Sequence, residues 1–346
     1  MTAAQLMEIP PQERADLLNE AGARTGLNPV LIEKDYWVCF LLALLFEPGG
    51  PGRDVIFKGG TSLSKGYGLI DRFSEDVDLV FDKRLFGFDG ARHPELVSKA
   101  QAKTLIADLS AAVAAHVAGP FRSQMSEQAA GRLGKQGWSL EIDPKEPTTL
   151  LFAYPSSLPA EFYRAVSYVP SVVRLEAGAR SDPWPAEQRT ITSYAATVFP
   201  ALLNDAATAA KVLSPTRTFW EKATILHAEA HRADGAGASR CSRHYYDLTR
   251  IADSPYGAAA LSDAELRDRV VVHKSLYFRS GWARYDLAIP GSFRLIPGED
   301  RLKALKKDYV AMRTMFFDEP PAFEAILRSL RALEEQINDQ SRAPMH

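Results

Sequence analysis

The stretch FKGGTSLSKGYGLIDRFSEDVDLVF, residues 57–81, sets a Gly-Gly turn ahead of two aspartates that lie one residue apart in an apolar run. The run VDLVF predicts a strand. Side chains alternate faces in a strand, so Asp76 and Asp78 should point to one side while Val77 and Leu79 point into the core. Two carboxylates on one face repel each other. A divalent cation, Mg²⁺ or Mn²⁺, would relieve that repulsion, because it takes oxygen ligands and shares them with phosphates.

The segment before the aspartates has the composition of a phosphate site. Gly59 and Gly60 end the preceding apolar run and would allow the backbone to approach a triphosphate closely. Thr61 and Ser62 then open a short helix, whose first N–H groups favour anions. Lys65, one turn further, would reach the same phosphates. This stretch therefore predicts a nucleoside triphosphate as substrate, with Gly59 to Ser62 and Lys65 as binding residues.

Each half of this pattern has a plainer explanation when taken alone. A single Asp-X-Asp is most often a solvated strand edge, since charged residues are mostly exposed. A Gly-Gly pair alone marks only a turn. The spacing G-x-x-x-x-G-K-[ST] of a Walker A loop is missing, so the turn is not a P-loop. The two halves about fifteen residues apart suit strand–turn–helix–strand, and together they favour a metal–nucleotide site.

The whole chain has the composition of an ordinary globular protein. Its 346 residues are 46% hydrophobic and 24% charged, enough to bury a sizeable core. The net charge of −2 gives no global attraction to nucleic acid or anionic membrane, although a local basic surface is compatible with it. The two cysteines are far apart, which suits a reducing cytoplasm. The most apolar run, residues 37–46, is about half a bilayer span, so we expect no membrane segment.

The pattern along the chain predicts an α+β fold with a mixed sheet in three segments. Residues 1–52 form an N-terminal helical segment, 53–200 a mixed α/β core, and 201–346 a helical C-terminal domain. The expected strands are DVIF, VDLVF, WSLEID, TLLFAY and SVVRLEAGAR. The clearest later helices are TFWEKATILHAEAHR, SRHYYDLTRIAD, RLKALKKDYVAMRTMFF and AFEAILRSLRALEEQI.

The combination FKGGTSLSK and RFSEDVDL resembles the signature of the nucleotidyltransferase superfamily, and most of all the AbiEii/AbiGii-type toxins of type IV toxin–antitoxin pairs. The likeness extends over most of the chain, in the expected order. Its further segments are EKDYWV (33–38), VVRLEAGAR (172–180), TFWEKATILH (218–227), SRHYYDL (242–248) and KKDYVAMRTMFF (306–317).

The resemblance implies a polymerase-β-like nucleotidyltransferase core with a helical C-terminal half. It also implies metal-dependent transfer of a nucleotide from a triphosphate to an acceptor, which in well-studied relatives is the 3′ end of tRNA, with a block of translation as the result. A cognate antitoxin is the implied partner. Two alternatives stay open on the residues: a nucleotide- or RNA-binding interaction protein without transfer activity, and transfer of a nucleotide onto a protein hydroxyl.

Residue by residue, Gly60 and Ser62 match the family's turn, and Asp76 and Asp78 match its metal-binding carboxylates. Lys222 in WEKAT and Asp247 in HYYDL match two later residues that the family requires for activity.

Without the resemblance, Lys222 and Asp247 would be read as surface residues of helices. A third metal-binding carboxylate is usual in polymerase-β-like sites; Glu176, on one strand face with Arg174, is the candidate, and the family pattern leaves it open. For Glu33, Lys34 and Asp35 in EKDYW we expect a structural ion-pair set, with the two aromatic residues that follow in the core.

Overall fold

The computed structural model describes residues 5–165, 171–203, 207–232 and 240–340. The chain divides into two units, and the second unit consists of two separate stretches of the sequence. The first unit, the sheet unit, consists of Met1–Gly68 and Phe73–Leu213. The second, the helical unit, consists of Ser214–His346 together with the four residues Leu69–Arg72.

A seven-stranded mixed sheet forms the centre of the sheet unit, in the order β3-β4-β5-β2-β1-β7-β6. β2 pairs with β5, and β1 with β7, in parallel; the other neighbours are antiparallel. The strands are β1 (Val55–Lys58), β2 (Asp76–Phe81), β3 (Ser139–Ile142), β4 (Thr149–Ala153), β5 (Val172–Gly178), β6 (Ala186–Ile191) and β7 (Thr208–Leu213).

Helix α3 (Pro29–Phe46) is the core of the sheet unit. Asn28 caps its start by accepting a hydrogen bond from the N–H of Val30 at 2.9 Å, and every residue from Val30 to Leu45 is buried. Trp37 stacks on Tyr154 with ring centroids 5.5 Å apart. The helix ends at the Pro-Gly-rich turn, where the N–H of Gly52 donates to the carbonyl of Leu45 at 2.8 Å. The most apolar segment of the sequence is therefore a buried helix, as its length predicted.

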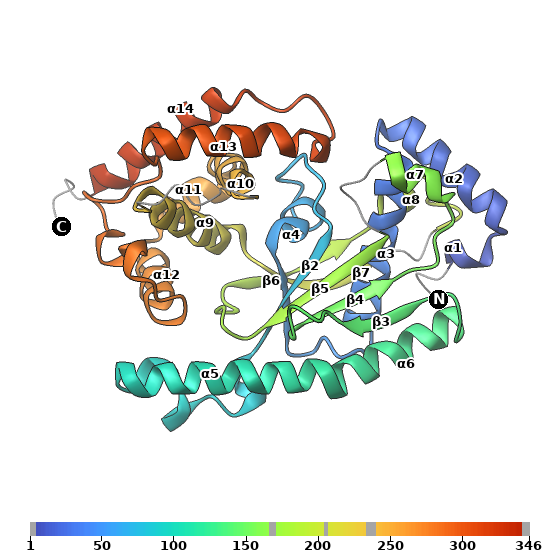
Figure 1. Cartoon of the computed structure of the whole chain (residues 1–346), viewed down its shortest axis with the longest axis horizontal. Helices are drawn as coiled ribbons and strands as arrows, with labels where there is room; N and C mark the ends of the chain where they lie inside the picture. The colour runs from blue at the N-terminus through green and yellow to red at the C-terminus, as the bar shows by residue number, and fades with distance from the viewer. Residues whose placement is uncertain (1–4, 166–170, 204–206, 233–239, 341–346) are drawn as a thin grey trace. The chain divides into compact units, whose positions relative to one another are not determined.

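The remaining helices of the sheet unit are α1 (Gln5–Glu8), α2 (Pro11–Thr25), α4 (Gly59–Lys65), α5 (Lys99–His116), α6 (Arg122–Leu133), α7 (Ala160–Ala165) and α8 (Tyr194–Val198). A π-helical turn, Val117–Phe121, joins α5 to α6 into one long stretch, seen along the sheet in Figure 1. This stretch of 35 residues is long and apolar enough to cross a bilayer by length and composition alone. Its buried stripe packs on the sheet: the ring of Phe121 meets that of Phe81 edge-on at 5.2 Å.

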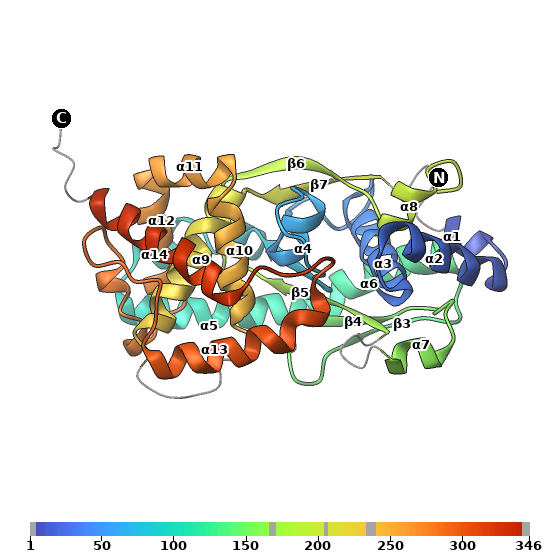
Figure 2. The ribbon, with the colours of Figure 1, turned by 90° about the horizontal axis from the view of Figure 1, so that it is seen from above.

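The helical unit is built around α9 (Pro215–Ala230), which packs against α10 (Ser242–Ala252), α11 (Pro255–Ser262) and α12 (Ala264–Tyr277) (Figure 2). The indole N–H of Trp220 on α9 donates to the carbonyl of Ala260 at 3.0 Å. The last two helices are α13 (Glu299–Ala311) and α14 (Phe323–Asp339), and both pack on α10.

The α+β class, the mixed sheet, the N-terminal helices and the helical C-terminal part are all as predicted. The predicted domain boundaries, in contrast, differ from those of the two units. Residues 1–52 are no separate segment, because α3 packs on the sheet. The core does not end at residue 200, because β7 lies between β1 and β6 and completes the sheet. Residues 69–72, predicted within the core, belong to the helical unit.

Candidate active site

Three carboxylates share one face of two neighbouring strands in the sheet unit. Asp76 and Asp78 are half-buried on β2, while Val77 and Leu79 between them are 0% and 2% exposed. β5 runs parallel to β2 in a register that sets Asp78 beside Glu176. Residues paired across a sheet point to the same face. The same-face geometry predicted for the two aspartates is therefore present, and Glu176 joins that face from the adjacent strand.

Arg174 supplies the positive charge on this face. Its guanidinium lies 2.6 Å from Asp143 and 3.2 Å from Glu176, and its Nε is 4.0 Å from Oδ1 of Asp76. One cation thus partly offsets several carboxylates. Asp143 follows β3 and was not predicted from the sequence, since nothing in the local pattern links it to residues thirty positions later.

The donor chemistry of this face suits a hard divalent cation, because Asp76 and Asp78 offer only oxygen ligands. Among the residues that the structure describes, however, no three His, Cys, Asp or Glu side chains are arranged to hold a metal ion. The carboxylate of Glu176 is engaged by Arg174. The residues fit a two-carboxylate metal site, and the predicted third ligand, Glu176, is not assembled with the other two.

The glycine turn directly adjoins Asp78. Lys58, the last residue of β1, pairs with Asp78 in the antiparallel ladder, and Gly59 follows with a φ of +82°. A Cβ added to Gly59 would lie 1.8 Å from Oδ2 of Asp78. Only glycine permits both this backbone conformation and this approach of the carboxylate. The turn and the aspartate therefore form one compact feature.

The hydroxyls of the turn hold the turn itself. Thr61 donates to the carbonyl of Asp76 at 2.5 Å, and Ser62 donates to the carbonyl of Gly59 at 2.9 Å. Both side chains are buried. The structure thus brings the predicted residues Gly59, Thr61 and Ser62 up against the carboxylate strand, but it uses the two hydroxyls as internal cross-links.

Lys65 differs from the prediction. Its ammonium lies 2.8 Å from Oδ1 of Asp35 on α3 and 3.7 Å from the ring centre of Tyr194, with the side chain 5% exposed. The Lys65 ammonium, which was expected to reach phosphates, is therefore engaged in a buried ion pair. The sequence showed a lysine one turn after the glycines but gave no sign of its acidic partner thirty residues earlier.

Lys58 lies next to the carboxylate face and was not among the residues predicted from the sequence. It lies opposite Asp78 in the ladder, and its ammonium donates to the hydroxyl of Ser181 at 2.8 Å. The available signal was its position immediately before the Gly-Gly pair. The segment that contains Ser181 connects β5 to β6, so Lys58 ties this connection to the carboxylate face.

Lys222 and Asp247 meet inside the helical unit. Oδ2 of Asp247, which is fully buried, accepts a hydrogen bond from the ammonium of Lys222 at 2.7 Å. Arg72, from the segment contributed by residues 69–72, donates two further hydrogen bonds to the same carboxylate, at 2.8 Å and 2.7 Å. His244 lies 3.4 Å from the Lys222 ammonium through Nδ1. The structure thus joins the two predicted residues and adds Arg72, which the sequence analysis did not select.

The charges of this cluster shift the protonation of its members. Burial alone would raise the pKa of Asp247, but Arg72 and Lys222 outweigh it and hold the pKa below its usual value. Burial lowers the pKa of Lys222, and the charge of Arg72 adds to this while Asp247 opposes it. Burial and the neighbouring Lys222 and Arg243 hold the pKa of His244 well below 6.5. Two cations compete for one carboxylate, and the lysine is the one whose charge is destabilised.

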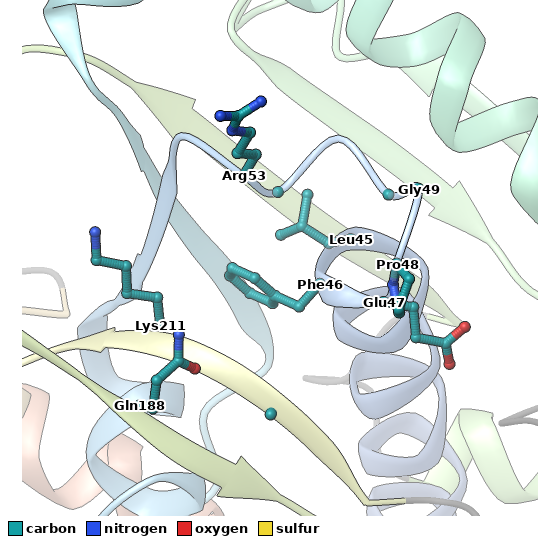
Figure 3. Close-up of a pocket in the computed structure, with 11 residues that line it drawn as sticks. Leu45, Phe46, Glu47, Pro48, Gly49, Arg53, Gln188 and Lys211 are labelled. Atoms are coloured by element: carbon teal, nitrogen blue, oxygen red, sulfur yellow. The ribbon is translucent and has the colours of Figure 1, made fainter.

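A hollow of about 420 Å³ lies elsewhere in the sheet unit, at the end of α3 (Figure 3). Phe46, Arg53, Gln188 and Lys211 are among the residues around it. None of the residues predicted for catalysis or nucleotide binding lines it. Its basic side chains, Arg53 and Lys211, are exposed, and this hollow is separate from the carboxylate face.

Comparisons with known proteins found one family model and a solved structure. Residues 43–329 match the model of the family described as "Nucleotidyl transferase AbiEii toxin, Type IV TA system". No curated protein matches the chain. Among solved structures, the nucleotidyltransferase toxin MenT4 from Mycobacterium tuberculosis H37Rv is similar, with 14% identity, a TM-score of 0.38, and coverage of 91% of this chain and 98% of that one.

Proposed function

Because the chain belongs to the AbiEii family of nucleotidyltransferase toxins of type IV toxin–antitoxin systems, we propose that it transfers a nucleotide from a nucleoside triphosphate to the 3′ end of tRNA and so blocks translation. Membership implies a nucleotide substrate and a cognate antitoxin. The observation that carries the proposal is the same-face pair Asp76 and Asp78, packed against the glycine turn at Gly59. The tRNA acceptor rests on the resemblance of the sequence alone. We also propose that this reaction takes place in the cytoplasm.

In the proposed mechanism, Asp76 and Asp78 would hold Mg²⁺ or Mn²⁺. When bound, the cation would neutralise phosphate charge and stabilise an in-line displacement. The turn from Gly59 to Ser62 offers backbone close to these carboxylates, where a triphosphate would lie. An acceptor hydroxyl would attack the α-phosphate, and pyrophosphate would leave.

We assign Lys222 and Asp247 to the same reaction. Lysine suits the neutralisation of a phosphate oxygen because its ammonium is a compact charge. Asp247 would orient that ammonium, and Arg72 would fix the carboxylate in turn. The resemblance of WEKAT and HYYDL to the later motifs of the family supports the assignment.

Incubation with each labelled triphosphate (ATP, CTP, GTP or UTP), total tRNA and Mg²⁺ tests the proposal. The wild-type protein should label RNA, and Asp78→Ala and Asp76→Ala should lose transfer by more than about 100-fold, because even outer-shell partners of metal ligands are worth 10–100-fold. Asp54→Ala, a change at an exposed aspartate just before β1, is the matched control and should stay active.

The thermal unfolding of each variant, compared with wild type, separates lost chemistry from lost folding. Full metal-dependent transfer by Asp78→Ala would refute the mechanism. Label on protein in place of RNA would identify a protein hydroxyl as acceptor. Binding of tRNA without any incorporated label would identify an interaction protein.

A further inference from the structure

Three consecutive charged residues lie in the middle of the buried helix α3. Glu33, Lys34 and Asp35 are 0%, 1% and 3% exposed. Successive helix residues point about 100° apart, so the three side chains reach three different neighbours. Burial of charges is costly unless each is paired. The sequence predicted a structural ion-pair set here. The residues that pair with Lys34 and Asp35 show which segments the set connects.

Lys34 reaches the start of the carboxylate strand. Its ammonium lies 2.7 Å from Oε2 of Glu75, and both side chains are buried. Glu75 is the residue immediately before Asp76. The contact therefore fixes the point at which β2 begins.

Asp35 reaches the helix that follows the glycine turn. One of its oxygens lies 2.8 Å from the ammonium of Lys65, the last residue of α4, and the other accepts the N–H of Tyr194 at 2.7 Å. α4 begins at Gly59. The hydroxyl of Thr61 in turn bonds the carbonyl of Asp76. α4 and β2 are thus linked to each other and, separately, to adjacent residues of α3.

We propose that Lys34 and Asp35 are positioning residues, which set the spacing between the turn at Gly59–Ser62 and the carboxylates of Asp76 and Asp78. The proposal rests on the function proposed above. Adjacent Cα atoms in a chain are 3.8 Å apart. The ion pairs of Lys34 and Asp35 therefore hold the start of β2 and the end of α4 to the same point on α3. A displacement of about 1 Å at a reacting centre costs about 100-fold in rate. In this assignment Lys65 acts through Asp35 and not on phosphate.

The test is a double-mutant cycle on Asp35 and Lys65. Asp35→Asn keeps an acceptor for the Tyr194 N–H and removes the charge; Lys65→Met keeps the aliphatic length. Each single change should lower kcat about 100-fold with KM for the triphosphate nearly unchanged, and the double variant should be no worse than either single one. Lys65→Arg, which keeps the charge, should recover part of kcat.

A parallel pair, Lys34→Met and Glu75→Gln, should behave in the same way. The matched control is the exposed pair of Glu20 and Arg24, where Glu20→Gln and Arg24→Met should leave kcat unchanged. If Lys65 instead contacts phosphate, Lys65→Met raises KM, Asp35→Asn has little effect and the two add. That result would overturn the proposal.

A second readout does not require turnover. Amide hydrogen exchange of the Asp35→Asn/Lys65→Met protein should accelerate in peptides covering residues 59–66 and 75–81 while the rest of the sheet unit stays protected. Unchanged or uniformly accelerated exchange would overturn the positioning role. A wild-type protein that transfers no label would refute the proposed function alone, because the exchange result still decides whether α3 holds these two segments.

Discussion

At the scale of single residues, the tightest constraint in the sheet unit is at Gly59. Its φ of +82° is unfavourable for any side chain, and a Cβ would overlap the carboxylate of Asp78. Several other glycines share a positive φ but have open space around them. Gly59 therefore allows the conformation of the turn and also leaves the space that the carboxylate of Asp78 occupies.

Gly59→Ala should abolish most transfer activity, since the methyl group must displace the carboxylate of Asp78. Gly87→Ala is the matched control: Gly87 has a φ of +72° and nothing within 4 Å of an added Cβ. We expect Gly87→Ala to lose about 1–2 kcal/mol of unfolding free energy, the cost of the left-handed conformation, with activity retained. Urea denaturation and the labelled-nucleotide assay measure the two effects. Equal activity in the two variants would contradict this role of Gly59.

Lys222 sets a prediction for pH. Its pKa is lowered by burial, so its ammonium loses the proton below lysine's usual 10.5. If the charge is needed, activity is present at lower pH and is lost as pH rises through this lowered pKa. Initial rates from about pH 7 to about pH 10 should show that alkaline limb. Lys222→Arg should be slower but should lack the limb, because guanidinium stays charged. An identical limb in both proteins would exclude Lys222 as its source.

The sequence predicted the geometry of the candidate site where the signal was local. Asp76 and Asp78 lie two apart in a strand, so their shared face followed from strand geometry. The acidic partner of Lys65 could not be predicted, because only the tertiary fold brings Asp35 near it. Arg72 was overlooked for the same reason, since its carboxylate is 175 residues away in the chain.

At the scale of elements, β6 and β7 are the two strands of the described sheet that the sequence did not reveal, and β7 shows why. Thr208–Leu213 reads TAAKVL, and alanine and lysine are depleted in strands. The buried side chains nevertheless alternate through most of the strand. Pairing with β1 on one side and β6 on the other outweighs the weak local preference. The predicted strands β1 to β5, in contrast, each contain at least one β-branched or aromatic residue.

Truncation tests the place of β7. A chain ended at residue 200, the predicted boundary, lacks β7, so β6 has no neighbour and β1 has an open edge. A chain ended at Leu213 keeps all seven strands. We expect the first to lose cooperative thermal unfolding by circular dichroism and the second to show a more cooperative transition. Equal transitions in the two would contradict the role assigned to β7.

At the scale of the whole molecule, the fold class followed from the order of the elements, but the division into units did not. Periodicity predicted strands first and helices later, which is the α+β arrangement found. Nothing in the composition of residues 69–72 marks them as part of the helical unit. Their assignment depends on contacts such as those of Arg72 with Asp247 and of Asp71 with Tyr246 and Arg250.

The discontinuous helical unit has a consequence for biosynthesis. Residues 69–72 leave the ribosome long before α9 and α10 are made, and chains emerge from the N-terminus at about 5–20 residues per second. Until Asp247 has emerged, the guanidinium of Arg72 lacks the carboxylate to which it donates two hydrogen bonds in the finished protein. The cluster of Arg72, Lys222 and Asp247 therefore cannot assemble until most of the chain has been synthesised, so a nascent chain lacks this part of the helical unit.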